Sequence, residues 1–160
     1  MNTTRRMAAL RTRLRSRAAH LVFLLTRPLT MGVRGVVVRG DSLLLVRHAY
    51  VSGWHFPGGG VEPGETCAEA LGRELEEEAR VALRGPPALH GLFFNAGPSR
   101  RDHVAVYLVR DYEILGERAP DREIEEARFF PLSTLPEGTT RGTRARIAEI
   151  FEGAPLRPLW

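Results

Sequence analysis

The stretch Gly59–Val81, GGVEPGETCAEALGRELEEEARV, constrains the fold of this chain more than any other segment. A T-x-x-E capping box at Thr66 predicts a helix that begins after this residue and runs to about Ala79. Leu71 and Leu75 are four positions apart and share one face of that helix. We therefore expect the helix to pack its apolar face on a sheet.

The same helix carries an unusual concentration of carboxylates on another face. At 100° per residue, Glu74, Glu77 and Glu78 fall within an arc of roughly 100°, because residues three and four apart are neighbours on a helix. Like charges at these spacings destabilise a helix, and Arg73 supplies only one positive charge nearby. A hard divalent cation such as Mg²⁺ would offset the excess, since it prefers oxygen ligands and substrate phosphates.

A glycine loop, Pro57-Gly58-Gly59-Gly60, precedes this helix. Glycines leave main-chain amides and carbonyls open to a phosphate or a metal ion. We expect the loop to face the acidic side of the helix. Each feature alone is common on protein surfaces, but their combination at this spacing predicts a metal and phosphate site.

The remaining pattern predicts a sheet around this helix. Strands are expected at residues 33–39, 43–48, 88–94, 103–110 and 127–130, and a further helix at 144–151. Gly40 and Asp41 divide the first two strands and indicate a β-hairpin. Strands mixed with helices favour a single α/β domain with a mixed sheet, which we place at residues 31–160.

Residues 1–30 have a different composition. Apolar residues recur at spacings of three and four between arginines, which predicts an amphipathic basic helix over residues 4–26. Nine arginines precede the first acidic residue, Asp41, and seven of them lie in residues 1–30, so the overall pI of about 10.1 describes this appendage rather than the domain. Three interpretations remain open: a helix packed on the domain or across a homodimer, an anchor on a membrane surface or an anionic partner, and an organelle transit segment.

The cysteine content and the length of the apolar runs bear on the cellular location of the protein. The single cysteine, Cys67, excludes an internal disulfide framework, and it lacks a partner that would indicate catalysis. The apolar run at residues 21–25 is too short to cross a bilayer. We expect a soluble, cytoplasmic protein.

The segment also resembles the Nudix box, G-x5-E-x7-R-E-U-x-E-E-x-G-U, where U is a bulky aliphatic residue. Eight of the nine defined positions match, and they are Gly59, Glu65, Arg73, Glu74, Leu75, Glu77, Glu78 and Val81. Arg80 replaces the late glycine of the box, which normally caps the helix in a left-handed conformation at a cost of about 1 kcal/mol for another residue. The flanking residues 54–57 and 123–132 are similar to Nudix sequence as well, so the resemblance spans residues 33–151.

This resemblance implies an α/β/α sandwich that hydrolyses a nucleoside diphosphate linked to another moiety. It implies Mg²⁺, with Mn²⁺ as the alternative, held by Glu74, Glu77, Glu78 and the main-chain carbonyl of Gly58. Arg73 is expected to orient these glutamates, with Glu65 holding it. For the general base the resemblance leaves Glu74 and Glu78 from the box and Glu123 from a later loop.

Several other residues are candidates for contact with a small-molecule nucleotide substrate. Trp54 or Phe94 could stack on a base, although aromatic residues at strand ends usually belong to a core. Arg100, Arg101 and His103 follow a turn-rich stretch and could meet phosphates or a sugar. Two other functions remain as alternatives: a nucleotide-sensing module without turnover, and a nucleic-acid-binding protein that uses the basic N-terminus, which the acidic domain disfavours.

Overall fold

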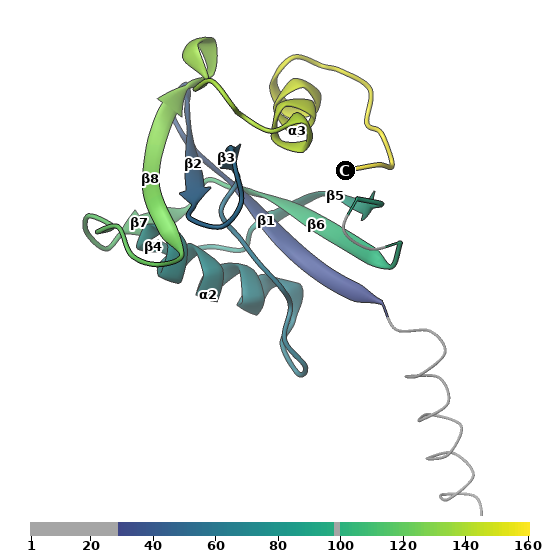
Figure 1. Cartoon of the computed structure of the whole chain (residues 1–160), viewed down its shortest axis with the longest axis horizontal. Coiled ribbons are helices and arrows are strands. Elements are labelled where there is room, and N and C mark those ends of the chain that lie inside the picture. Colours follow the sequence, from purple (N-terminus) through teal and green to yellow (C-terminus); the bar gives the residue numbers. More distant parts are fainter. Residues whose placement is uncertain (1–28, 98–99) are drawn as a thin grey trace, which may run out of the picture.

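The computed structural model describes residues 29–97 and 100–160, so the predicted N-terminal helix lies outside the described residues. Six strands form one sheet in the order β3-β2-β1-β6-β5, with β8 paired to β2 (Figure 1). Their bounds are β1 (Thr30–Arg39), β2 (Ser42–His48), β3 (Trp54–His55), β5 (Ala88–Asn95), β6 (Asp102–Val109) and β8 (Ile124–Pro131). β1 and β6 are parallel and the other pairs antiparallel, which confirms the expected mixed sheet.

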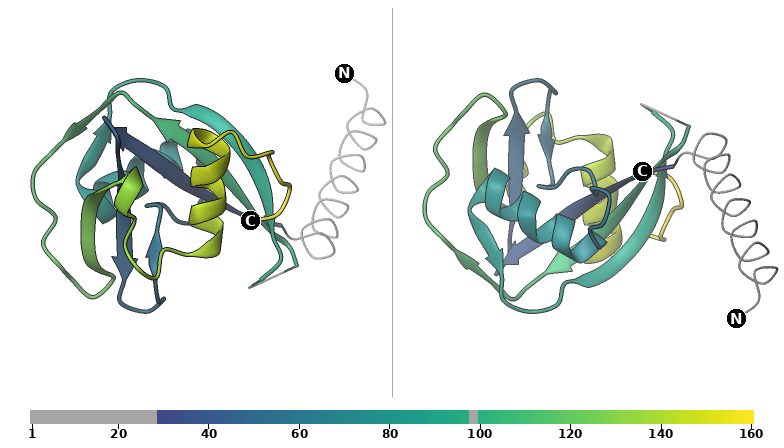
Figure 2. Two further views of the ribbon diagram at one scale, coloured as in Figure 1. Left: turned by 90° about the horizontal axis from the view of Figure 1, so that it is seen from above. Right: turned by 90° about the horizontal axis from the view of Figure 1, so that it is seen from below.

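Two helices cover opposite faces of this sheet (Figure 2). α2 (Cys67–Ala79) packs over one face and α3 (Arg141–Phe151) over the other. Successive side chains of a strand point to opposite faces of the sheet. Val36 and Val37 of β1 are both fully buried, each in a different hydrophobic cluster, so both faces of the sheet are apolar. Neither helix in residues 29–97 and 100–160 is long and apolar enough to cross a membrane.

The glycine loop owes its position to the divergence of β1 and β2. These strands pair only next to their turn, at Val38 with Leu43 and Arg39 with Ser42, and the rest of β1 is left open on that side. The loop fills the space: the amide of Gly35 donates to the carbonyl of Pro57 at 2.9 Å, and the amide of Val33 to that of Gly59 at 2.9 Å.

Gly58 is required at the centre of this loop. Its φ is 138°, a conformation that other residues rarely adopt, and a Cβ there would collide with the carbonyl oxygen of Val33. The loop can therefore lie directly against β1 only because residue 58 has no side chain.

α2 begins and ends as the sequence predicts. Thr66 is its N-cap, and the side chain of Glu69 completes the capping box. Arg80 is the C-cap in the left-handed conformation, at φ 55° and ψ 41°, and is the only residue other than glycine with positive φ in the described parts of the chain. The arginine thus adopts the conformation expected of the glycine it replaces.

Several short elements were not predicted from the sequence. These are β3, the pair formed by β4 (Val81–Leu83) and β7 (Tyr112–Ile114), and the 3₁₀ turn η1 (Leu132–Thr134). β8 also starts at Ile124, three residues before the predicted start. Two or three residues are too few to show a period of two, so tertiary pairing decides these strands.

Candidate active site

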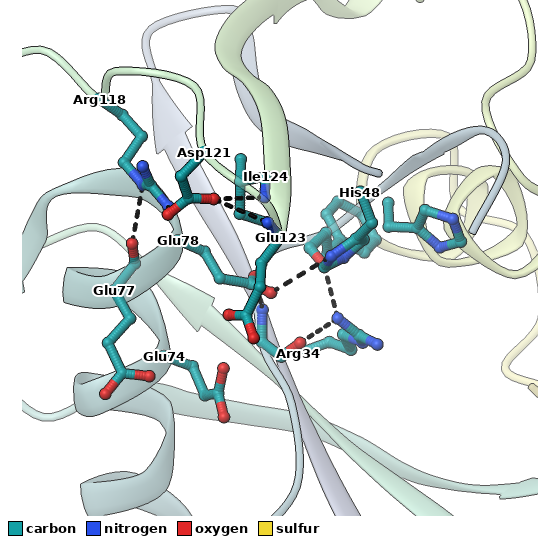
Figure 3. A network of polar contacts seen from close by, with 12 residues as sticks. Arg34, His48, Glu74, Glu77, Glu78, Arg118, Asp121, Glu123 and Ile124 are labelled. Carbon is teal, nitrogen blue, oxygen red and sulfur yellow. Dashed lines mark hydrogen bonds and ion pairs between the residues drawn. The ribbon is translucent and has the colours of Figure 1, made fainter. Parts of the chain in front are cut away.

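An open cleft of about 940 Å³ lies between the acidic face of α2, the glycine loop and the loop before β8. We call it the acidic cleft. Glu74, Glu77 and Glu78 line it from α2, and Glu123 lines it from the later loop. Figure 3 shows the carboxylates of Glu74, Glu78 and Glu123 directed toward a common space. The structure therefore brings together the box glutamates and the loop glutamate that the sequence could not place.

Glu78 is the most buried of these carboxylates, with 9% of the residue exposed. Its Oε2 accepts the amide hydrogen of Gly58 at 2.7 Å, which joins the helix to the glycine loop. Burial raises the pKa of Glu78 to about 7, although the Gly58 amide and the Arg34 charge oppose that shift. The site therefore leaves this carboxylate short of positive charge.

His48 stands beside Glu78 without supplying that charge. Its Nδ1 lies 3.7 Å from Oε1 of Glu78, and the ring is buried. Burial, followed by the charges of Arg34 and His55, lowers the pKa of His48 to about 4. The imidazole is consequently neutral near pH 7.

Arg73 organises the outer part of the cluster, in the contacts expected of it. Its Nε donates to Glu65 at 2.9 Å, and its Nη1 donates to Glu74 at 2.8 Å and to Glu77 at 3.4 Å. Nη2 also donates to the carbonyl of Gly60 at 3.1 Å. One guanidinium thus holds three box glutamates and the end of the glycine loop, while its pKa is raised by the Glu65 and Glu74 carboxylates.

Arg34 is a site residue that the sequence reasoning missed. It projects from β1 (Figure 3). Its guanidinium donates to the carbonyl oxygens of Phe56, at 3.2 Å, and Gly58. The Gly58 carbonyl, predicted as a metal ligand, therefore already accepts one hydrogen bond and keeps one lone pair. The signal was present in the sequence, because Arg34 is the single charge within the apolar run 33–38.

Two further site residues that the sequence analysis did not identify, Arg118 and Asp121, hold the loop before β8. Arg118 donates from Nε to the main-chain oxygen of Glu77 at 2.8 Å and from Nη2 to Asp121 at 2.6 Å. Oδ1 of Asp121 accepts the amides of Glu123 at 2.9 Å and Ile124 at 2.8 Å. These hydrogen bonds lower the pKa of Asp121 to about 2, and the bond from the Ile124 amide contributes most. The pair fixes Glu123 across the cleft from α2.

The predicted substrate contacts from other segments do not line the acidic cleft. Trp54 is buried in the core, with its ring 4.7 Å from that of Phe130. Phe94 lies on β5 with its ring 5.4 Å from that of His103. Arg100 and Arg101 are exposed at the β5–β6 connection. The contacts assigned to these five residues stay predictions.

The donors around the cleft suit a hard cation chemically. Four carboxylates and a main-chain carbonyl supply only oxygen atoms, and a Cβ on Gly59 would collide with the Glu74 carboxylate, so the glycine keeps this space open. Within residues 29–97 and 100–160, no three acidic, histidine or cysteine side chains already form a metal-binding group. The Glu77 side chain is 61% exposed, so it must turn inward to join the others.

Comparison with known proteins agrees with this arrangement. The profile of the NUDIX domain matches residues 28–150. The chain belongs to the Nudix family. It is 31% identical over 111 residues to the ADP-ribose pyrophosphatase of Methanocaldococcus jannaschii, covering 67% of this chain and 64% of that protein. It is 33% identical over 120 residues to the NAD-capped RNA hydrolase NudC of Stutzerimonas stutzeri, covering 69% of this chain and 40% of that one.

A solved Nudix structure shows the same fold. The MutT NUDIX hydrolase from Burkholderia pseudomallei superimposes with a TM-score of 0.66 at 27% identity, over 76% of this chain and 97% of that chain. The Nudix-type α/β fold expected from the box is therefore confirmed. The match spans less than two thirds of the length of either curated relative.

Proposed function

We propose that this Nudix protein hydrolyses a nucleoside diphosphate linked to another moiety, with Mg²⁺ or Mn²⁺ as the cofactor. The observation that carries the proposal is the buried Glu78 carboxylate, which lies beside Glu74 on α2, faces Glu123 across the acidic cleft and lacks a full positive partner. A diphosphate with divalent cations supplies the positive charge and fills the cleft at the same time.

The proposed ligands are Glu74, Glu77 and Glu78, with the free lone pair of the Gly58 carbonyl. Bound there, the cations would neutralise the diphosphate oxygens. Arg73 holds Glu74 in place through a hydrogen bond, and the Gly58 amide fixes the rotamer of Glu78. The ligands thereby need little rearrangement when substrate arrives, apart from the exposed Glu77.

Glu123 is our choice for the general base. Its carboxylate faces the carboxylates of α2, and its main chain is fixed by Asp121. Glu78 is less suited because its Oε2 already accepts the Gly58 amide. In the proposed step a water oxygen bonds to phosphorus as the bridging P–O bond breaks. Glu123 accepts the water proton, and the leaving phosphate keeps the electron pair.

The first substrate to test is ADP-ribose, because a curated relative is named as its pyrophosphatase. The purified chain should release AMP from ADP-ribose, or a nucleoside monophosphate from another member of a panel of nucleoside diphosphate derivatives, only when Mg²⁺ or Mn²⁺ is present. Product release is followed by chromatography.

A matched pair of variants tests the base. Glu123→Gln should lower kcat at least about 100-fold, the scale of general-base catalysis. Glu125→Gln is the control, since Glu125 is exposed two residues away and pairs with Arg47 at the surface. Binding of nucleotides without turnover by the wild-type protein would overturn the proposal in favour of the sensing module.

A further inference from the structure

A second cavity, of about 270 Å³, adjoins the glycine loop that also lines the acidic cleft. It is bounded by the start of β1, the end of β5 and the start of β6, and Trp160 forms one wall, so we call it the Trp160 pocket. Gly59, Gly60 and Arg34 line both this pocket and the acidic cleft. A ligand with its diphosphate in the cleft can therefore extend over the loop into the pocket.

The polar end of the Trp160 pocket is an oriented carboxylate. Asp102 accepts a hydrogen bond from the Thr30 hydroxyl at 2.8 Å on Oδ1 and one from the Asn95 side-chain amide at 2.8 Å on Oδ2. Each carboxylate oxygen keeps a lone pair for a further hydrogen bond, whereas Thr30 and Asn95 each use a donor to bind Asp102. The pocket thus offers acceptors at this end, which select a ligand with N–H or O–H donors and disfavour a phosphate.

The aromatic wall is held by the chain on both sides. The amide of Trp160 donates to the carbonyl of Phe94 at 3.0 Å, and the amide of Phe94 donates to that of Pro158 at 2.8 Å. The indole also packs so closely on Gly142 of α3 that a Cβ there would lie 2.8 Å from its Nε1. Trp160 therefore presents a fixed, partly exposed ring to the pocket.

A buried ion pair anchors the segment that carries Trp160. Arg146 of α3 is fully buried, and it donates to the carbonyl of Leu159 at 3.1 Å and to Glu149 at 2.6 Å. Glu149 also accepts the amide of Arg157 at 3.0 Å. The cost of burying these charges is balanced within the pair, and the pair fixes residues 157–159 against α3.

We propose that the Trp160 pocket binds the nucleobase of the substrate, with the base stacked on Trp160 and its N–H donors on Asp102. The inference rests on the proposed function for the direction of the diphosphate. Guanine is the preferred base because its N1–H and its amino group are adjacent donors that match the two oxygens of one carboxylate. Adenine and cytosine place an acceptor beside their amino group, and uracil places acceptors on both sides of its N–H.

The test is calorimetric titration of the wild-type chain with guanosine, adenosine and uridine 5′-monophosphates in EDTA, which requires no turnover. The guanosine nucleotide should bind about 10-fold tighter than the other two. Trp160→Ala should weaken its binding about 10-fold or more, and Trp160→Phe less, because a phenyl ring still stacks. Leu156→Ala is the matched control, since Leu156 is 57% exposed in the same segment and lies outside the pocket.

Asp102→Asn keeps the size of the side chain and should remove the preference for guanine while retaining stacking. The inference is overturned if Trp160→Ala binds the guanosine nucleotide like the wild type, or if Asp102→Asn keeps the wild-type preference. Should Trp160→Ala unfold, Trp160→Phe and Asp102→Asn decide the same two points. Selective binding without hydrolysis of any guanosine diphosphate derivative would refute the proposed function and support the pocket.

Discussion

Two glutamates with little-exposed side chains, Glu78 on α2 at 12% and Glu149 on α3 at 3%, lie on opposite faces of the sheet and differ in their surroundings. Burial raises the pKa of Glu149 as it does that of Glu78, but hydrogen bonds from His90, the Arg157 amide and Arg146 outweigh it, so the pKa of Glu149 is lowered. Glu78 receives one amide and no guanidinium hydrogen bond, and its pKa is raised to about 7. Both side chains are thus little exposed to solvent, and they differ in the number of hydrogen-bond donors around them.

The difference separates a structural carboxylate from a candidate catalytic one. Glu149 stabilises its surroundings because its charge is matched within the protein. Glu78 lowers stability unless something from solution supplies the missing charge. A buried acid short of partners in an open cleft thus indicates a ligand site, while an acid whose side chain is little exposed and accepts from three donors indicates packing.

The largest expected effect comes from breaking the matched pair. Glu149→Gln leaves the buried Arg146 charge without its counterion, which should lower the free energy of unfolding by about 3 kcal/mol or more. Urea denaturation at pH 7 measures this loss. A change below about 1 kcal/mol would show that Arg146 is satisfied without Glu149.

The pH dependence of that loss provides its control. A carboxyl with a lowered pKa in the folded state stabilises the protein above its unfolded pKa, about 4.3, and loses this contribution as the pH falls through the folded value. The stability difference between Glu149→Gln and the wild type should therefore shrink below about pH 4. A difference that stays constant down to pH 2 would assign the loss to packing.

The unmatched acid should respond in the opposite way. Glu78→Gln should lower turnover at least about 100-fold, because a cation ligand is lost, and should leave stability unchanged or improved. Steady-state kinetics and urea denaturation of the same sample separate the two effects. Glu137→Gln is the control, since Glu137 is exposed and does not line the acidic cleft. Equal turnover of Glu78→Gln and the wild type would remove Glu78 from the site.

The two regions also differ in how far the sequence predicts them. Residues 57–81 form one continuous segment, so helical periodicity alone placed Glu74, Glu77 and Glu78 together and predicted the caps of α2. Arg34, His48 and Asp121 reach the site from β1, β2 and a distant loop, and only the pairing of the strands brings them there. The Trp160 pocket is lined by residues far apart in the sequence, from Thr30 to Trp160, so no local sequence pattern predicts it.

A smaller effect is expected from the loop that positions Glu123. Asp121→Ala removes the acceptor for the amides of Glu123 and Ile124 and should lower kcat about 10-fold through misplacement of Glu123. Asp121→Asn retains an acceptor oxygen and should recover part of that loss. Steady-state kinetics with both variants measures kcat and KM. Equal rates for Asp121→Ala and the wild type would show that the loop does not depend on Asp121.

The smallest effect concerns the cap of α2. Arg80→Gly should raise the free energy of unfolding by up to about 1 kcal/mol, because glycine adopts the left-handed conformation without steric cost. Gly64→Ala is the converse control: its φ is 97° and nothing lies within 4 Å of the added Cβ, so any loss there reports the backbone alone. A clear destabilisation by Arg80→Gly would mean that contacts of the arginine side chain outweigh its strain.

Thermal unfolding with and without Mg²⁺ tests the central contrast most directly. A cation that binds only the folded protein raises its melting temperature by mass action. The wild type and Glu149→Gln should both melt at a higher temperature in 10 mM Mg²⁺, on the order of a few degrees, although Glu149→Gln starts from a lower value. Glu78→Gln should show no such increase. An equal increase in Glu78→Gln and the wild type would contradict the assignment of the unmatched glutamate to the cation site.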